Sequence, residues 1–131
     1  MDASPLVDAI RNAVPEAQAI YLFGSAARGD AGPESDIDLA LLVPRALTPR
    51  ARWEIQERLA VLAHRNVDLV DLREASAVMR VNVLDDGQLL LDAAPYERAL
   101  FEATALADYA RLQEERREIL QQIAREGRVY G

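Results

Sequence analysis

The sequence contains no cysteine and no lysine, and it has a single histidine. The absence of cysteine excludes disulfides, zinc–thiolate sites and thiol chemistry. All 15 basic residues are arginine, so the phosphate-binding lysine of a P-loop and covalent intermediates on a lysine amine are excluded as well. The histidine, His64, follows a helical stretch, and we interpret it as a residue of the helix end rather than as a catalytic base. Any chemistry therefore has to come from carboxylates, hydroxyls, arginines and the backbone.

The chain is also short of positive charge and of long apolar runs. Its 131 residues carry 22 acidic and 15 basic side chains, a net charge of −7, which argues against broad electrostatic binding of nucleic acid. No run reaches membrane-spanning length, and the first residues lack the basic start and apolar stretch of a secretion signal. We therefore expect a single domain over residues 1–131, located in the cytoplasm, that folds without a metal or disulfide.

A turn at Gly24 and Ser25 is the first candidate site. The preceding run, Ala19–Phe23, is apolar and contains β-branched and aromatic residues, as is typical of a buried strand. Gly24 lets a phosphate approach the backbone, and Ser25 places a hydroxyl at the opening of a helical turn, where free N–H groups favour anions. Arg28 shares a face with Ser25 if that turn is helical. We predict that Gly24 and Ser25 hold phosphates, with Arg28 as a further ligand.

Two carboxylates, Asp36 and Asp38, follow this turn at the start of a second apolar run, Ile37–Val43. Side chains two apart on a strand share a face, with Cα atoms about 6–7 Å apart, so both can converge on metal ions. Magnesium prefers sites with few carboxylates, where water and substrate phosphates complete its shell. Two-metal sites of this kind clamp the attacking and leaving oxygens of a displacement at phosphorus. The spacing therefore predicts a site for two Mg²⁺ ions.

A third carboxylate is expected from the next strand-like run, Val67–Leu72, which offers Asp68 and Asp71. The two are three residues apart, so they face opposite sides of a strand and only one can point into the site. We prefer Asp68, near the start of the run. Asp71 is the alternative, and its competing interpretation is a cap for the following helix.

The remaining pattern alternates helices and strands. Helices are predicted from Ser4-Pro5 to Val14, from Pro49 to Ala63 and around Glu74–Val83, and a short strand over Gln88–Leu91. The order αβαβαβαβα indicates a small mixed sheet flanked by helices, an α/β (α+β) fold with its core at about residues 1–94. A C-terminal helical segment over about residues 95–126, as one helix or two, follows. Beyond Asp108 its apolar side is as suited to binding a partner as to packing.

The Gly-Ser-x-Ala-Arg-Gly motif followed by Ser-Asp-x-Asp-Leu resembles the minimal nucleotidyltransferases of the DNA polymerase β superfamily. Further along, Val67–Ser76 with Val78-Met-Arg80, and the segment that begins at Asp108-Tyr-Ala-Arg, resemble the MntA-type antitoxins encoded beside HEPN-domain toxins. The resemblance covers nearly the whole chain. The first two motifs are specific for the superfamily, whereas the later segments carry the subfamily assignment.

The resemblance implies a polymerase-β-like fold and an Mg-dependent protein adenylyltransferase, the antitoxin of a type VII toxin–antitoxin system. Such an enzyme transfers AMP from ATP to a tyrosine of its HepT-like RNase toxin. Matched position by position, Gly24 and Ser25 would hold the triphosphate and Asp36 and Asp38 the metals. Asp68 would complete the metal site and help to activate the acceptor hydroxyl.

Two alternatives remain open at this point. One is an antitoxin that covers the toxin's active site without chemistry, and the other is a nucleotidyltransferase for a small molecule or an RNA end. Enzymes of the latter kind usually add an acceptor-binding domain, for which a chain of 131 residues has little room.

Overall fold

A four-stranded mixed sheet forms the centre of the computed structural model, which describes residues 1–30, 32 and 35–130, with side chains up to residue 127. The residues between Gly29 and Ser35 are rich in turn-forming types, and positions 31, 33 and 34 among them lie outside the described residues. The elements are α1 (Ser4–Ala13), β1 (Ala19–Phe23), α2 (Gly24–Arg28), β2 (Ile37–Leu42), α3 (Pro49–Ala63), β3 (Val67–Asp71), α4 (Ala77–Asp86), β4 (Gln88–Asp92) and α5 (Pro95–Tyr130). This is the predicted alternating order and the predicted fold class.

The strands lie in the order β3-β2-β1-β4. β1 runs antiparallel to both β2 and β4, and β2 and β3 are parallel. Their connection through α3 is the crossover that a parallel pair requires. β2 is therefore a central strand, and β3 is an edge strand.

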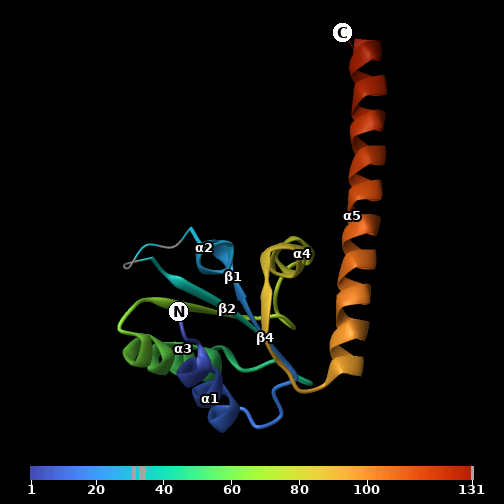
Figure 1. Cartoon of the computed structure of the whole chain (residues 1–131). Coiled ribbons are helices and arrows are strands. Elements are labelled where there is room, and N and C mark those ends of the chain that lie inside the picture. The colour runs from blue at the N-terminus through green and yellow to red at the C-terminus, as the bar shows by residue number, and fades with distance from the viewer. Residues whose placement is uncertain (31, 33–34, 131) are drawn as a thin grey trace.

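Each face of the sheet has its own apolar core, and Figure 1 shows the helices divided between the two faces. On one face, Ile10 of α1 and Leu59 of α3 pack with Leu39 of β2 and its neighbours. On the other face, Val83 of α4 and Phe101 of α5 pack with alternate strand residues such as Ala40, Leu42 and Tyr21. This is the alternation that a sheet covered on both sides requires.

The helix ends follow local signals that the sequence contains. Thr48 caps α3 by accepting a hydrogen bond from the Ala51 N–H at 3.1 Å, and Pro49 occupies its first turn. His64 ends α3 in the left-handed conformation, with φ of 53°, as its interpretation as a helix-end residue required. None of the described helices is long and apolar enough to cross a membrane.

Two helices differ from expectation. The predicted helix Glu74–Val83 begins only at Ala77, because residues 72–74 form a turn and the Ser76 hydroxyl caps the helix by accepting from the Met79 N–H. It then continues to Asp86. The C-terminal segment is one helix of 36 residues, and Figure 1 shows its second half extending far beyond the rest of the molecule.

Candidate active site

The turn after β1 lies directly against one of the predicted carboxylates. Gly24 opens α2 with φ of 69°, in the region that favours glycine. Phe23, just before it, is the register partner of Asp38 in β2. A Cβ atom on Gly24 would overlap Asp38 Oδ2 and lie 3.2 Å from its Cγ. The absence of a side chain at Gly24 is therefore what lets the Asp38 carboxylate approach the start of α2 and Ser25.

Asp38 and Asp68 are register partners in the parallel pair β2–β3. Register partners on adjacent strands project from the same face, and here that is the face covered by α4 and α5, because Ala40 and Leu42 follow Asp38 at two-residue steps. Asp36, exposed and two residues before Asp38, precedes β2 directly.

Asp36 and Asp68 are close enough to Asp38 to affect its carboxylate. Burial raises the pKa of Asp38, and the carboxylates of Asp68 and Asp36 raise it further, whereas the Arg28 guanidinium lowers it. The structure thus brings together Gly24, Asp36, Asp38 and Asp68 at one end of the sheet, in a patch of unbalanced negative charge.

The carboxylates do not form a closed cage. In the described part of the chain, no three acidic or histidine side chains are gathered tightly enough to hold a metal ion by themselves. Mg²⁺ commonly uses one or two carboxylates and takes its other ligands from water and substrate phosphates. An open carboxylate set beside the Gly24–Ser25 turn fits that ion better than it fits a structural metal.

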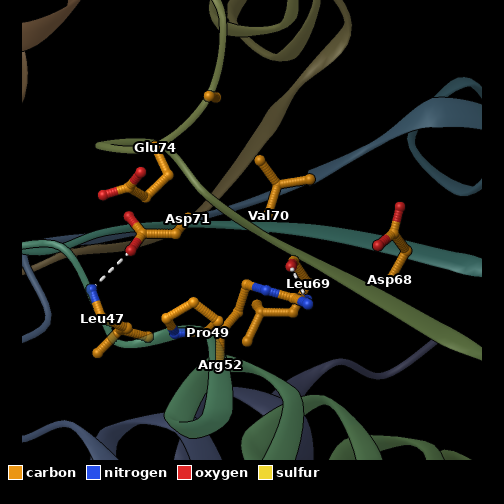
Figure 2. A pocket seen from close by; sticks show the side chains of 9 residues that line it. Leu47, Pro49, Arg52, Asp68, Leu69, Val70, Asp71 and Glu74 are labelled. Atoms are coloured by element: carbon orange, nitrogen blue, oxygen red, sulfur yellow. Dashed lines mark hydrogen bonds between the residues drawn. The ribbon is translucent and has the colours of Figure 1, made fainter.

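Asp71 faces the other way and is occupied by structural hydrogen bonds, as Figure 2 shows. Its side chain is 3% exposed and accepts from the Leu47 N–H at 2.7 Å and the Arg73 N–H at 2.9 Å. It therefore fixes the segment before α3 to the turn after β3. Of the two interpretations of Asp71, third carboxylate or helix cap, the helix cap is closer to what the structure shows, although Asp71 caps the turn after β3 and not the helix α4.

Arg28 lies beside the site but is paired with acidic residues. Its Nε is 3.2 Å from Asp30 and its Nη1 is 3.0 Å from Asp86, with the side chain 48% exposed. In this arrangement Arg28 connects α2 to the end of α4. Its role as a phosphate ligand stays a prediction.

Arg65 is a positioning residue that sequence reasoning missed. Its guanidinium donates to the Ser35 carbonyl from both Nε, at 3.0 Å, and Nη2, at 2.6 Å. The next residue, Asn66, accepts from the Ile37 N–H at 2.9 Å. These bonds fix the backbone on both sides of Asp36. Nothing in the sequence marks Arg65, since its partners are main-chain carbonyls 30 residues away.

A cavity of about 480 Å³ lies along the β3 edge and reaches Asp68 at one end. It continues between the start of α3 and the turn after β3, where its lining includes Pro49, Arg52 and Glu74. Sequence reasoning did not find this cavity, because it depends on how α3 packs against an edge strand.

Comparison with known proteins agrees with this geometry. The family model described as "Polymerase beta, Nucleotidyltransferase" matches residues 7–96, a segment that includes all the candidate residues. The chain is 36% identical over 123 residues to a protein adenylyltransferase, MntA, of Shewanella oneidensis, covering 94% of this chain and 88% of that protein.

Solved structures extend the similarity to the full fold. A crystal structure of a toxin–antitoxin with AMP-PNP matches with a TM-score of 0.86 and 36% identity, over 94% of this chain and 98% of that one. An MNT antitoxin in complex with a tri-AMPylated HEPN toxin of Shewanella oneidensis matches with a TM-score of 0.77 and 35% identity, over 92% and 93% of the two chains. With its fold, motifs and sequence in agreement, the chain belongs to the polymerase β nucleotidyltransferase family.

Proposed function

We propose that this protein is an antitoxin that transfers AMP from ATP to a tyrosine of a HEPN-family toxin and thereby neutralises it. The observation that carries the proposal is the Asp38–Asp68 pair beside the Gly24–Ser25 turn, in a chain 36% identical to a protein adenylyltransferase. Two matched structures add support, one with AMP-PNP and one with a tri-AMPylated toxin. A reaction that consumes ATP also agrees with the expected cytoplasmic location.

The reaction is a single displacement at the α-phosphorus of ATP. The Gly24–Ser25 turn holds the triphosphate through backbone N–H groups and the serine hydroxyl. The acceptor phenol attacks in line, its oxygen forms the new bond to phosphorus, and the bond to the bridging oxygen breaks to release pyrophosphate. Asp68 accepts the phenol proton. No lysine is present to form an AMP intermediate, so transfer goes directly to the acceptor.

Asp36, Asp38 and Asp68 are the residues that would hold Mg²⁺. Two bound ions would supply charge neutralisation at the phosphates and at the entering oxygen. The chain's own contribution is the half-buried position of Asp38, whose pKa is raised by burial and by the two neighbouring carboxylates. A cation bound between these carboxylates would relieve their mutual repulsion.

The outer half of α5 is the surface we propose for toxin binding. Leu112, Ile119, Leu120 and Ile123 are all exposed there, the last three between 58% and 60%. A helix that presents such side chains away from its own fold is suited to lie in a groove of a partner. Packing against the chain's own sheet, the competing interpretation beyond Asp108, is not what this part of the helix does (Figure 1).

The test is AMP transfer to the HEPN protein encoded beside this chain. The protein is incubated with labelled ATP, Mg²⁺ and that partner, and intact masses are measured. We expect mass increases of AMP on a partner tyrosine, lost in Asp36→Asn and Asp38→Asn. Asp8→Asn, an exposed aspartate of α1, is the matched control.

Transfer that survives in both site variants would refute the metal assignment. Tight binding of the toxin without any transfer would instead favour an antitoxin that acts by binding alone.

A further inference from the structure

The arrangement of the strands separates the two substrates of the proposed reaction. The phosphate turn follows β1, Asp38 belongs to the central strand β2, which Asp36 directly precedes, and Asp68 lies on the edge strand β3. In-line displacement requires the entering and leaving oxygens to lie on opposite sides of the phosphorus. With the triphosphate on the β1 side, the acceptor has to arrive from the β3 side.

A cavity is already present on that side. Its volume of about 480 Å³ falls within the range of about 300–1,000 Å³ typical of ligand sites. Asp68 lines one end, and the side chains of Leu47, Pro49, Val70 and Ala75 contribute an apolar lining. In Figure 2, Asp68 and Val70 project from the same side of β3, so an aromatic ring against Val70 can direct a substituent towards the Asp68 carboxylate.

The strand edge beside this cavity is closed to an added strand. The outward-facing N–H of Leu69 donates to Gln56 Oε1 at 2.9 Å, and the Leu69 carbonyl accepts from Arg52 Nη1 at 3.0 Å. Arg52 Nη1 also donates to Gln56 Oε1 at 3.0 Å, which joins the two side chains into one clamp. Because main-chain pairing at the centre of β3 is blocked, a partner has to enter the cavity with a side chain.

We infer that this cavity is the acceptor pocket, which takes the phenol side chain of a tyrosine carried on a loop of the partner protein. The inference rests on the proposed function and adds the residues that select the acceptor. Val70 and Ala75 contact the ring, and Asp68 receives the hydroxyl proton. Glu74 lines the same cavity and is exposed.

Filling the pocket tests the inference. Ala75→Trp adds bulk at a bend outside the helices and strands, and Val70→Phe adds it at a half-buried strand position. For each variant, kcat/KM for AMP transfer to the HEPN partner and Kd for ATP with Mg²⁺ are measured, with Tm as the check on folding. Ala13→Trp, at the exposed end of α1, is the matched control.

We expect kcat/KM to fall at least 100-fold in both filled variants, while Kd for ATP stays within twofold of the unmodified protein. Transfer within twofold in a folded Ala75→Trp or Val70→Phe variant overturns the pocket and leaves the proposed function intact. Loss of ATP binding in both filled variants also overturns the acceptor pocket, since the cavity would then be part of the nucleotide-binding site. An unmodified protein that binds ATP but never modifies the partner refutes the proposed function and the pocket with it.

Discussion

At the scale of single residues, Asp38 combines the proposed catalytic role with a cost to folding. It is half-buried, with the carboxylates of Asp36 and Asp68 as neighbours, and burial and these charges raise its pKa. A raised pKa means that the folded protein disfavours the ionised form. The contribution of Asp38 to folding stability therefore falls as the pH rises above its ordinary pKa of 3.8.

Asp38→Asn should for this reason raise Tm at pH 7 while AMP transfer is lost. The amide keeps the size of the side chain and removes the charge that the fold disfavours. The difference in Tm between the two proteins should shrink near pH 4, where the carboxylate of the unmodified protein takes up its proton. Thermal unfolding at both pH values measures this. A lower Tm at pH 7 would show that the carboxylate stabilises the metal-free fold.

Alanine variants at Gly24 and Gly29 distinguish the cost of backbone strain from the effect of disturbing the candidate site. Both have positive φ, 69° and 79°, so alanine costs about 1–2 kcal/mol of backbone strain at either position. At Gly24 the added Cβ also overlaps the Asp38 carboxylate, whereas at Gly29 it meets no atom within 4 Å.

We therefore expect Gly24→Ala to lose more unfolding free energy than Gly29→Ala and to lose ATP binding, which Gly29→Ala should keep. Urea unfolding and nucleotide titration of the two variants measure both effects. Equal losses in both assays would mean that the Asp38 carboxylate can move away without consequence.

At the scale of elements, β3 carries two aspartates with opposite tasks. Asp68 pairs with Asp38 on the face covered by α4 and α5. Within the described residues its side chain makes no hydrogen bond, so its replacement removes none. Asp71 is buried and accepts from two backbone N–H groups, at Leu47 and Arg73.

Asp71→Ala should lower the free energy of unfolding by about 2–4 kcal/mol, because it leaves two part-buried N–H donors without their charged acceptor. Asp68→Ala should leave stability nearly unchanged and abolish transfer. Chemical denaturation and transfer assays on the pair decide which aspartate serves the site. Full transfer activity in Asp68→Ala would show that Asp68 is not the third carboxylate of the site, and Asp71 would then have to be tested in that role.

The contact between β1 and α5 gives a second prediction at this scale. The Tyr21 hydroxyl donates to Glu102 Oε1 at 2.8 Å from a side chain that is 3% exposed. Burial and this hydrogen bond raise the pKa of Tyr21. The folded protein thus retains the phenol proton more strongly, so this stabilisation is complete below pH 10 and decreases as the pH rises beyond it.

Tyr21→Phe should cost about 1 kcal/mol of unfolding free energy at pH 7. Between pH 9 and pH 11 (roughly the ordinary range of tyrosine ionisation), the unmodified protein should lose stability more steeply than the variant. Urea unfolding across this range provides the measurement. Identical slopes for the two proteins would show that Tyr21 does not contribute to the alkaline transition.

At the scale of the whole molecule, α5 divides into a packed part and a protruding part. Phe101 and Ala105 are buried against the sheet and α4, whereas the side chains from 114 to 127 are exposed. The packed part completes one of the two cores, and the protruding part contributes little to it.

Ending the chain after Gln113 should therefore leave Tm within a few degrees and abolish binding of the HEPN partner. The remaining helix keeps both buried residues, and surface removal of this kind changes stability little. Calorimetry of the shortened chain measures its Tm, and titration with the HEPN partner measures binding. If the shortened chain binds the HEPN partner as tightly as the full chain, the toxin interface must lie on another surface.

The order of elements and the glycine turn after β1 could be predicted from the sequence because both depend on neighbouring residues. An apolar run ending at Gly24 and helical spacing after Pro49 are local signals. The start of α4 was wrong by three residues, since the turn that displaces it is held by Asp71 together with Leu47, which lies 24 residues away in the chain.

The residues of the candidate site were proposed from their spacing and stay a prediction, whereas their arrangement could not be proposed from the sequence. The spacing of Asp68 and Asp71 showed that they face opposite sides, yet only the β2–β3 register pairs Asp68 with Asp38. The Arg65 contacts and the edge cavity required the path of α3 across the sheet. The extent of the domain, residues 1–131 with a division near residue 94, stays a prediction.

The length of α5 has a consequence for how binding and catalysis are divided in this chain. At about 1.5 Å per residue, its 36 residues make a rod about 54 Å long. Only the first part of the rod packs against the sheet and α4, through Phe101 and Ala105. A partner that binds the protruding part therefore contacts a surface that carries none of the candidate site residues, so that substitutions there can weaken binding without altering the site itself.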